Sequence, residues 1–417
     1  MPYITRDIEN KLKEAAKQFA SITIYGPRQV GKSTVVKRLF HDVPSISMDN
    51  LELRNYALKD PSGFVRSLET PILIDEIQKA PELLEGIKEI IDKKKLEWLE
   101  QGEDVKLLYI LSGSNQFELQ EAISESLAGR TCVFNLSSLS YNEIVRRGSS
   151  APFSPSIEVL QRKAANLGET RSRREIFSSI FLGGMPEYID RSPDRDMFFS
   201  SYISTYLEKD VRKLVEADKI TVFLDFMKYV ALRSACQINF SEIARSIGID
   251  ARTVKSWLSI LETSGIIKQI TPYYKNLSDR ITKANKLYFM DTGLCAYLCG
   301  IPSSEILERS AFAGAFYETY VVSEIIKSFY NGYKSADCIY YYRDKDQKEV
   351  DLVIEEFDSV YPIEIKKGVG SVSSKKNFSF LNKYGKKVNV GLVIDSSERL
   401  MRLNDEAYIC PIDTIGL

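Results

Sequence analysis

The sequence predicts an α/β fold divided among several domains, and two patterns indicate it. Up to about residue 150, short apolar segments at residues 21–25, 45–48, 71–74 and 106–111 alternate with longer helical stretches. This alternation is typical of a parallel sheet that helices cover on both faces. From about residue 311, a helical segment is followed by several strand-like segments. With 417 residues, 44% of them hydrophobic, the chain is long enough for about two to four domains.

Composition excludes several classes of protein. The formal net charge is -1, so any surface for nucleic acid has to be a local patch. Six cysteines are scattered and His41 is the only histidine, which excludes a four-ligand zinc cluster of Cys/His pairs. No apolar run approaches the roughly 20 residues that span a bilayer. We therefore expect a cytoplasmic protein with no membrane partner, whose cysteines are buried thiols.

The most specific motif is GPRQVGKST at residues 26–34, which follows the apolar segment 21–25 and opens a helical segment. It satisfies G-x-x-x-x-G-K-[ST] in the required strand, loop and helix context, where backbone N–H groups cradle phosphate. We predict that Lys32 contacts the β- and γ-phosphates of a nucleotide and that the Ser33 hydroxyl ligates Mg²⁺. The predicted nucleotide-binding loop comprises Gly26, Pro27, Arg28, Gln29, Val30, Gly31, Lys32, Ser33 and Thr34.

The second half of this site is predicted in PILIDEIQ, an apolar segment that ends in two acids. Asp75 is expected to bind the Mg²⁺ of the nucleotide, and Glu76 to act as the catalytic residue that polarises the attacking water. The alternative is that both are ordinary acids at the end of a strand. Together, the two motifs predict a P-loop NTPase that hydrolyses its nucleotide.

Two weaker elements extend the predicted site. Ser112, Ser114 and Asn115 follow another apolar segment, where a polar side chain can orient the lytic water, although a plain turn explains them almost as well. Arg130 in ESLAGR precedes the apolar segment TCVFNL. An arginine placed against the γ-phosphate stabilises developing charge, so Arg130 is a candidate catalytic residue, with a structural ion pair as the alternative.

In the order in which its motifs occur, the chain resembles the prokaryotic AAA-type ATPases that join a P-loop domain to a winged helix and a C-terminal domain with a restriction-endonuclease-like core. The resemblance covers nearly the whole chain and rests on GPRQVGKST, LIDEIQ, ILSGS, SLAGR, FLGGMPEYI, SYISTYLEKDVRKL, GAFYETYVVSEI, EVDLVIEE and IEIKKG. It implies ATP rather than GTP as the nucleotide. It also suggests a homo-oligomer in which Arg130 serves the γ-phosphate of a neighbouring subunit.

Four parts of the chain are expected. Residues 1–150 form the AAA-type P-loop ATPase domain, 151–174 a polar linker or mobile loop, 175–310 a helical and winged-helix region, and 311–417 a restriction-endonuclease-like α/β domain.

The third part contains a helix-turn-helix pattern, in which Ala244 and Val254 flank Gly248 at the required spacing. Arg252, Lys255 and Ser259 are then placed to line a face for the major groove of DNA. Structural coupling to the next domain is the alternative role of this unit.

The last part contains charges in apolar surroundings. In IEIKKG, Glu364 and Lys366 project from the same side of a strand, while Asp351 and Glu318 interrupt apolar faces where an unpaired charge is costly. We predict that the four side chains converge: Glu318, Asp351 and Glu364 as ligands of Mg²⁺, and Lys366 as the catalytic group that orients or deprotonates the nucleophile. For Glu364 and Lys366, the alternative is an exposed ion pair worth about 0–1 kcal/mol.

Asp351 and the trio from Glu364 to Lys366 match the PD-(D/E)xK pattern of metal-dependent nucleases, except that Val350 stands in place of the proline. The lysine-rich run at 366–387 is a candidate basic face for phosphates, or else a solvated helix face. The predicted function is a Mg²⁺-dependent ATPase with a winged helix and a nuclease-like domain that acts on or near DNA. The rival prediction is a signalling or protein-remodelling ATPase whose last domain only binds a partner.

Overall fold

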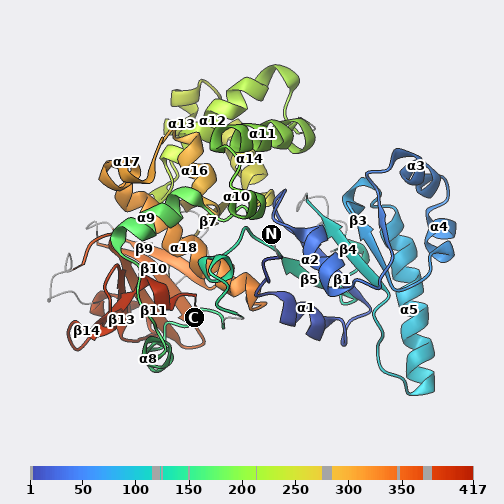
Figure 1. Cartoon of the computed structure of the whole chain (residues 1–417), viewed down its shortest axis with the longest axis horizontal. Coiled ribbons are helices and arrows are strands. Elements are labelled where there is room, and N and C mark those ends of the chain that lie inside the picture. The colour runs from blue at the N-terminus through green and yellow to red at the C-terminus, as the bar shows by residue number, and fades with distance from the viewer. Residues whose placement is uncertain are drawn as a thin grey trace.

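The computed structural model describes residues 3–114, 123, 125–148, 151–212, 214–274, 284–344, 348–369 and 378–416. Figure 1 shows an N-terminal sheet, in blue, on one side of the molecule and a C-terminal sheet, in red, on the other. Helices from the middle of the chain lie above and between the two sheets (Figure 1). The predicted class, a parallel sheet followed by a helical region and a second α/β domain, is confirmed.

The N-terminal domain is built on a five-stranded parallel sheet with the order β2-β3-β4-β1-β5. Each of the four apolar segments predicted as strands overlaps one of these strands. The strands are β1 (Ser21–Tyr25), β2 (Ser45–Ser47), β3 (Ile72–Asp75), β4 (Tyr109–Gly113) and β5 (Thr131–Asn135). The helices are α1 (Glu9–Ala15), α2 (Lys32–Leu39), α3 (Leu51–Lys59), α4 (Pro61–Ser67), the short η1 (Ile77–Lys79), α5 (Leu83–Gln101) and α7 (Tyr141–Ile144).

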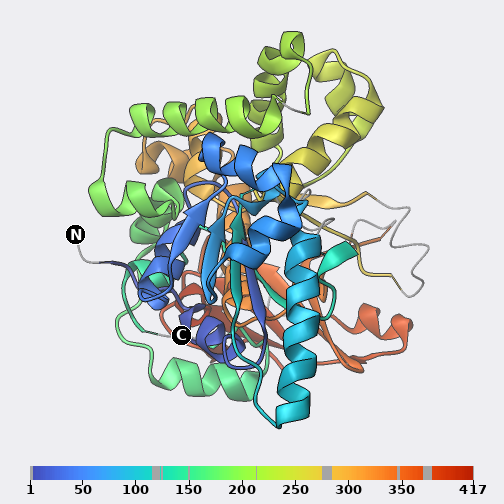
Figure 2. The same cartoon turned by 90° about the vertical axis from the view of Figure 1, so that its right-hand side faces the viewer.

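Helices cover both faces of this sheet because apolar side chains alternate along its strands. Leu73 and Ile110 belong to a buried cluster with α1 and α2 on one face. Ile74 and Leu111, one residue further along each strand, belong to a second cluster with α4 and α5 on the other face. Figure 2 shows the long helix α5 in front of the sheet.

Strand order places the predicted nucleotide site at one edge of the sheet. Tyr25, the last residue of β1, pairs with Gly113 of β4, and Asp75 at the end of β3 pairs with Ser112 of β4. The loop after β1 and the acids at the end of β3 therefore lie on either side of β4, at the carboxyl ends of the parallel strands, where α/β sheets bind ligands.

The expectation of a polar linker or mobile loop at 151–174 is corrected. This segment contains helix α8 (Ile157–Ala165), and both Phe153 and Leu160 are fully buried. The backbone N–H of Phe153 donates to Ser328 Oγ at 3.0 Å. The Pro/Ser/Gly composition concealed these two apolar anchors, which dock the segment onto the rest of the molecule.

The third part combines helices with a small antiparallel sheet. Its helices are α9 (Arg173–Leu182), α10 (Pro186–Arg191), α11 (Arg195–Tyr206), the π-helix η2 (Leu207–Val211), η3 (Ala217–Lys219), α12 (Ile220–Leu232), α13 (Phe240–Ile247), α14 (Ala251–Thr263), α16 (Thr292–Leu298) and α17 (Ser304–Arg309). The sheet has the order β6-β8-β7, from β6 (Cys236–Gln237), β7 (Ile267–Ile270) and β8 (Lys286–Phe289). Helix α13 ends at Gly248 in a left-handed conformation, with φ 80°, which turns the chain into α14.

The C-terminal domain combines the long helix α18 (Ala313–Asn331) with a mixed sheet. Strands β9 (Ile339–Arg343), β10 (Glu349–Glu356) and β11 (Ser359–Ile365) are antiparallel neighbours, and β11 continues in parallel to β13 (Gly391–Asp395) and β15 (Ala407–Pro411). The remaining elements are η4 (Ser379–Tyr384), β12 (Lys387–Val388), β14 (Met401–Arg402) and η5 (Ile412–Thr414).

One hydrophobic cluster joins the third part to the C-terminal domain. It extends from Phe153 to Ile415 and includes most of the buried face of α18. Helix α18 packs against β8 of the small sheet and also against β11 of the C-terminal sheet. The predicted boundary near residue 310 therefore does not separate two independent cores.

Two expectations from composition can be compared with the fold. Among the described residues, no helix is long and apolar enough to cross a membrane. All six cysteines are free thiols, of which Cys132, Cys295 and Cys410 are buried.

Candidate functional site

The predicted phosphate loop wraps the N-terminus of α2. Gly31 precedes the helix with φ 91°, a left-handed conformation that favours glycine. Lys32 folds back over the loop, and its Nζ donates to the carbonyl oxygens of Gly26 at 2.9 Å and Pro27 at 2.8 Å. Burial lowers the pKa of Lys32 to about 8, against the opposing effect of Glu76 and Asp75. The lysine is therefore a buried cation held by two backbone carbonyl contacts.

Ser33 and Asp75, predicted to bind one cation, are in direct contact. Ser33 Oγ donates to Asp75 Oδ2 at 2.7 Å, and Ser112 Oγ donates to Asp75 Oδ1 at 2.5 Å. A serine hydroxyl and a carboxylate are oxygen donors of the kind that Mg²⁺ prefers. The residues present therefore fit a Mg²⁺ ion that accompanies a nucleotide.

Glu76 lies beside this pair in a strained backbone conformation. Its φ of 55° is in the left-handed region, which is uncommon for a residue with a side chain. Gln78 Nε2 donates to Glu76 Oε2 at 2.5 Å, and Ser114 Oγ donates to the same oxygen at 3.3 Å. The carboxylate is thus fixed at the end of β3. The third polar residue predicted there, Asn115, lies outside the described residues.

Two contacts that support the phosphate loop were absent from the sequence-based prediction. Arg6, which is only 4% exposed, donates to the carbonyl oxygens of Val30 and Ser137, both at 2.8 Å. Arg28 makes a two-pronged ion pair with Asp210 of η2, from Nε at 2.5 Å and from Nη2 at 2.7 Å. Ser137 is far from Arg6 in the sequence, and Asp210 is far from Arg28.

A hollow of about 520 Å³ borders the other side of the phosphate loop. It lies between the N-terminal segment, the start of α2 and helix α10. Its lining residues are Tyr3, Ile4, Arg6, Gln29, Val30, Gly31, Thr34, Leu139, Pro186, Glu187, Asp190 and Arg191. The hollow is thus continuous with the residues predicted to hold phosphate.

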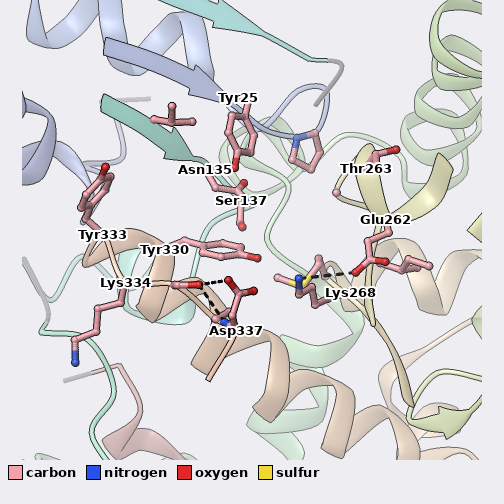
Figure 3. Close-up of a pocket in the computed structure, with 17 residues that line it drawn as sticks. Tyr25, Asn135, Ser137, Glu262, Thr263, Lys268, Tyr330, Tyr333, Lys334 and Asp337 are labelled. Atoms are coloured by element: carbon pink, nitrogen blue, oxygen red, sulfur yellow. Dashed lines mark hydrogen bonds and ion pairs between the residues drawn. The ribbon is translucent and has the colours of Figure 1, made fainter. Parts of the chain in front are cut away.

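A separate cavity of about 590 Å³ lies where the ATPase domain meets the later parts of the chain. Figure 3 shows Tyr25, Asn135 and Ser137 facing Tyr330 and Asp337 across it. Pro27 also lines this cavity, whereas Lys32, Ser33, Asp75 and Glu76 do not. No motif in the sequence predicted this interdomain cavity.

Arg130 directly precedes β5 and so lies at the amino end of that strand, whereas the predicted nucleotide site lies at the carboxyl ends of the parallel strands. Its Nε and Nη2 donate to the two carboxylate oxygens of Asp92 on α5, at 2.6 and 2.8 Å. This contact matches the structural ion pair that was the alternative for Arg130. A role in a neighbouring subunit stays a prediction.

The four residues predicted to converge in the C-terminal domain lie together. Lys366 Nζ is 2.6 Å from Glu364 Oε1 and 3.9 Å from Asp351 Oδ2. Glu364 is only 7% exposed, so an exposed ion pair does not describe this contact. Burial, followed by the charges of Glu318 and Glu364, raises the pKa of Asp351 to about 7.

The cluster also contains residues that sequence reasoning missed. Lys286 Nζ, from β8, lies 2.7 Å from Glu318 Oε1, 2.8 Å from Glu349 Oε1 and 3.9 Å from Asp351 Oδ1. Burial alone would lower the pKa of Lys286, but Tyr288 and the surrounding carboxylates raise it well above its ordinary value. A signal was available for Glu349, because it lies two residues before Asp351 and so shares its face of the strand.

The fit of this cluster to a metal differs from that of the nucleotide site. Within the described ranges, no group of three or more His, Cys, Asp or Glu side chains is arranged to hold a metal ion. The ammonium of Lys286 stands among the carboxylates instead. As they are arranged here, Glu318, Asp351 and Glu364 do not fit Mg²⁺, and their role as metal ligands stays a prediction.

Of the two surfaces predicted to contact DNA, the one on α14 is exposed, and the lysine-rich run is partly engaged in contacts within the protein. Arg252, Lys255 and Ser259 are exposed on α14, whose opposite side is buried. In the lysine-rich run, Lys383 Nζ donates to Tyr342 Oη at 2.8 Å, and Lys386 Nζ lies 2.9 Å from Glu355 Oε1. The run is thus partly engaged within its own domain, and residues 370–377 lie outside the described part of the chain.

Comparison with protein families divides the chain in three. The profile described as an AAA domain matches residues 18–145. Two profiles described as domains of unknown function, DUF8612 and DUF4143, match residues 173–305 and 313–415. With the phosphate loop and the parallel sheet, the first match supports an AAA-type P-loop ATPase domain.

Similar proteins extend over most of the chain. Uncharacterized proteins of Mycobacterium bovis and Mycobacterium tuberculosis are each 26% identical over 366 residues, which cover 87% of this chain and 74% of the relative. Among solved structures, a Walker-type ATPase of Pyrococcus abyssi aligns with TM-score 0.43 and 15% identity, over 70% of this chain and 94% of its own. A single-residue variant of RuvB from Thermotoga maritima aligns with TM-score 0.31 and 14% identity, over 63% of this chain and 88% of its own.

Proposed function

We propose that this chain, whose N-terminal part is an AAA-type P-loop ATPase domain, is a Mg²⁺-dependent ATPase coupled to a winged helix and a nuclease-like domain, and that it acts on or near DNA. The observation that carries the ATPase part is the meeting of Lys32, Ser33, Asp75 and Glu76 at the carboxyl edge of the parallel sheet. Each of these residues supplies one chemical requirement of phosphoryl transfer to water.

In the proposed mechanism, Lys32 exchanges the carbonyls of Gly26 and Pro27 for the β- and γ-phosphates of ATP. Ser33 and Asp75 would hold Mg²⁺, which neutralises negative charge that develops on the phosphates. Glu76 accepts a hydrogen bond from the attacking water and orients it, because Gln78 and Ser114 keep its carboxylate in place.

The hollow of about 520 Å³ beside the phosphate loop is the proposed place of the base and ribose. It continues directly from Gly31 and Thr34, and Tyr3 supplies an aromatic ring at its border. Helix α10 forms another wall with Glu187 and Arg191, so binding of the base would bring the helical region against the ATPase domain.

The winged-helix part of the proposal is supported by the turn at Gly248 between α13 and α14 and by the antiparallel pair β7–β8 that follows. The exposed positions Arg252, Lys255 and Ser259 lie on one face of α14 and are of a type that contacts phosphates and bases.

Binding of DNA by this face is tested with the double variant R252A/K255A. We expect it to reduce duplex affinity about tenfold and to flatten the salt dependence. The matched control is K59A/R66A, which removes two exposed charges from α3 and α4.

The endonuclease-like part is supported by the order α18, β9, β10, β11 and by the convergence of Asp351, Glu364 and Lys366. These residue types match the PD-(D/E)xK pattern, so metal-dependent cleavage of nucleic acid is a second candidate function, although the cluster as arranged here does not fit Mg²⁺. The rival is a domain that keeps the fold only to bind a partner, in a signalling or protein-remodelling ATPase.

One experiment separates these functions. Purified protein is incubated with single- and double-stranded DNA and RNA, with Mg²⁺ or Mn²⁺, with and without ATP, and both ATP hydrolysis and strand cleavage are measured. Cleavage that D351N removes, but that the same-strand control E356Q keeps, supports the nuclease. ATP hydrolysis stimulated by DNA without cleavage supports the binding function. ATP hydrolysis that no nucleic acid changes contradicts action on DNA.

A further inference from the structure

Lys286, from the small sheet of the third part, is a buried ammonium that lies within the acidic cluster of the C-terminal domain. It lies at the start of β8, in the small sheet next to α14, and is only 3% exposed. Its partners Glu318 on α18 and Glu349 and Asp351 on β10 all belong to the C-terminal domain. A lysine without such partners would not remain charged at this depth.

Strand β8 delivers two groups to the same carboxylate. Lys286 and Tyr288 are two residues apart and therefore share one face of the strand. Tyr288 Oη donates to Glu318 Oε1 at 2.7 Å, and Lys286 Nζ lies 2.7 Å from the same oxygen. One oxygen of Glu318 is thus bound by both a hydroxyl and an ammonium, so β8 occupies this side of the cluster.

The other acids of the cluster also have protein partners. The backbone N–H of Ile365 donates to Asp351 Oδ2 at 2.7 Å, and Lys366 pairs with Glu364 at 2.6 Å. An ammonium can bind several carboxylates at once because it offers three hydrogen-bond donors. A Mg²⁺ ion would need the same oxygens at about 2.0–2.1 Å, which the inserted lysine prevents.

We propose that Lys286 is the resident cation of this cluster: β8 supplies an ammonium at the position where metal-dependent nucleases hold a divalent ion. The acids then anchor β8 to the C-terminal domain and do not load a metal while β8 is docked. This inference rests on the proposed endonuclease-like nature of the domain, and it favours a binding role for that domain over cleavage.

The test is a titration of nucleotide-free protein with Mn²⁺, in which electron paramagnetic resonance measures the free ion. K286M removes the ammonium and keeps the bulk of the side chain, so we expect it to bind Mn²⁺ at least tenfold more tightly than the wild type. The double variant K286M/D351N should lose this gain. The matched control K268M removes a lysine from β7, the strand paired with β8, and should behave like the wild type.

If K286M does not fold, the inference can still be tested by comparing the wild type with D351N, since both keep Lys286. Wild type and D351N should take up Mn²⁺ equally, because Asp351 is not a metal ligand while Lys286 is present. Tight binding by the wild type that D351N abolishes would overturn the inference. A folded K286M with no new Mn²⁺ site would also overturn it.

The same variants distinguish this inference from the proposed function. If K286M gains a Mn²⁺ site but cleaves no nucleic acid, the inference stands and the nuclease candidate fails. If the wild type cleaves DNA with Mn²⁺ and needs Asp351, the nuclease candidate stands and the inference fails.

Discussion

Arg28 and Asp210 connect the phosphate loop to the π-helix η2 through two parallel hydrogen bonds, at 2.5 and 2.7 Å. Burial alone would lower the pKa of Arg28, but the hydrogen bond and charge of Asp210 raise it above its usual value. Two-pronged pairs of this kind fix direction as well as distance. A shift of the loop on binding phosphate would therefore be transmitted to the helical region.

The first prediction concerns this pair. D210N should destabilise the protein by about 1–3 kcal/mol, because the largely buried guanidinium of Arg28 loses its counter-charge. Denaturation in urea measures the loss. The control is E208Q, in the same helix as Asp210. It breaks an exposed ion pair with Arg212 and should change stability by less than about 0.5 kcal/mol. Equal effects of the two substitutions would contradict a special role for Asp210.

The second prediction concerns pH and Lys32. The pKa of this lysine is about 8 in the free protein, and the phosphates of ATP would raise it, so binding takes up a proton above pH 8. ATP affinity should therefore be constant below about pH 7.5 and fall by up to about tenfold per pH unit above pH 8. Calorimetric titration between pH 6.5 and 9.5 checks this. K32R keeps its charge throughout, so whatever affinity it retains should not fall in this range.

The third prediction separates binding from hydrolysis. E76Q should keep ATP affinity within about threefold but slow turnover by about 100-fold or more, because an amide cannot polarise the attacking water as a carboxylate does. K32A should instead weaken binding itself, since its charge contacts the phosphates directly. Equilibrium binding of a fluorescent ATP analogue and steady-state hydrolysis measure the two effects. Unchanged turnover in E76Q would refute the assignment.

The fourth prediction concerns Arg130 and a second copy of the chain. If Arg130 acts on the γ-phosphate of a neighbouring subunit, the ATPase rate per chain rises with protein concentration, and R130A lowers turnover by about 1,000-fold while ATP still binds. D92N releases Arg130 from its own-chain partner and should not lower turnover. A rate per chain that is independent of concentration in a monomeric sample, or equal losses in R130A and D92N, would assign Arg130 to a structural ion pair.

Local sequence was sufficient to predict that the residues of the candidate nucleotide site lie together, because they are contiguous or lie at strand ends. GPRQVGKST contains the loop, the lysine and the serine together, and Asp75 ends an apolar segment that had to be a strand of the same sheet. The convergence of Glu318, Asp351 and Glu364 was also predictable, since each interrupts an apolar stretch and needs a partner there.

Other parts of the sites could not be predicted because their partners are remote. Asp210 is 182 residues from Arg28, and nothing in its local surroundings marks it. Lys286 precedes three apolar residues and looks like the exposed start of a strand, although the C-terminal domain buries it. Only the packing of β8 against α18 and β10 reveals that its charge is used.

The continuous hydrophobic cluster from Phe153 to Ile415 has a consequence for how the chain unfolds. Helix α18 buries residues against both neighbours, so removing the C-terminal sheet would expose apolar surface that belongs equally to the helical region. The two parts should consequently share one cooperative transition, with the ATPase domain, which has its own two buried clusters, able to melt separately. A fragment cut near residue 310 would be aggregation-prone, whereas one cut near residue 150 would not split this shared core.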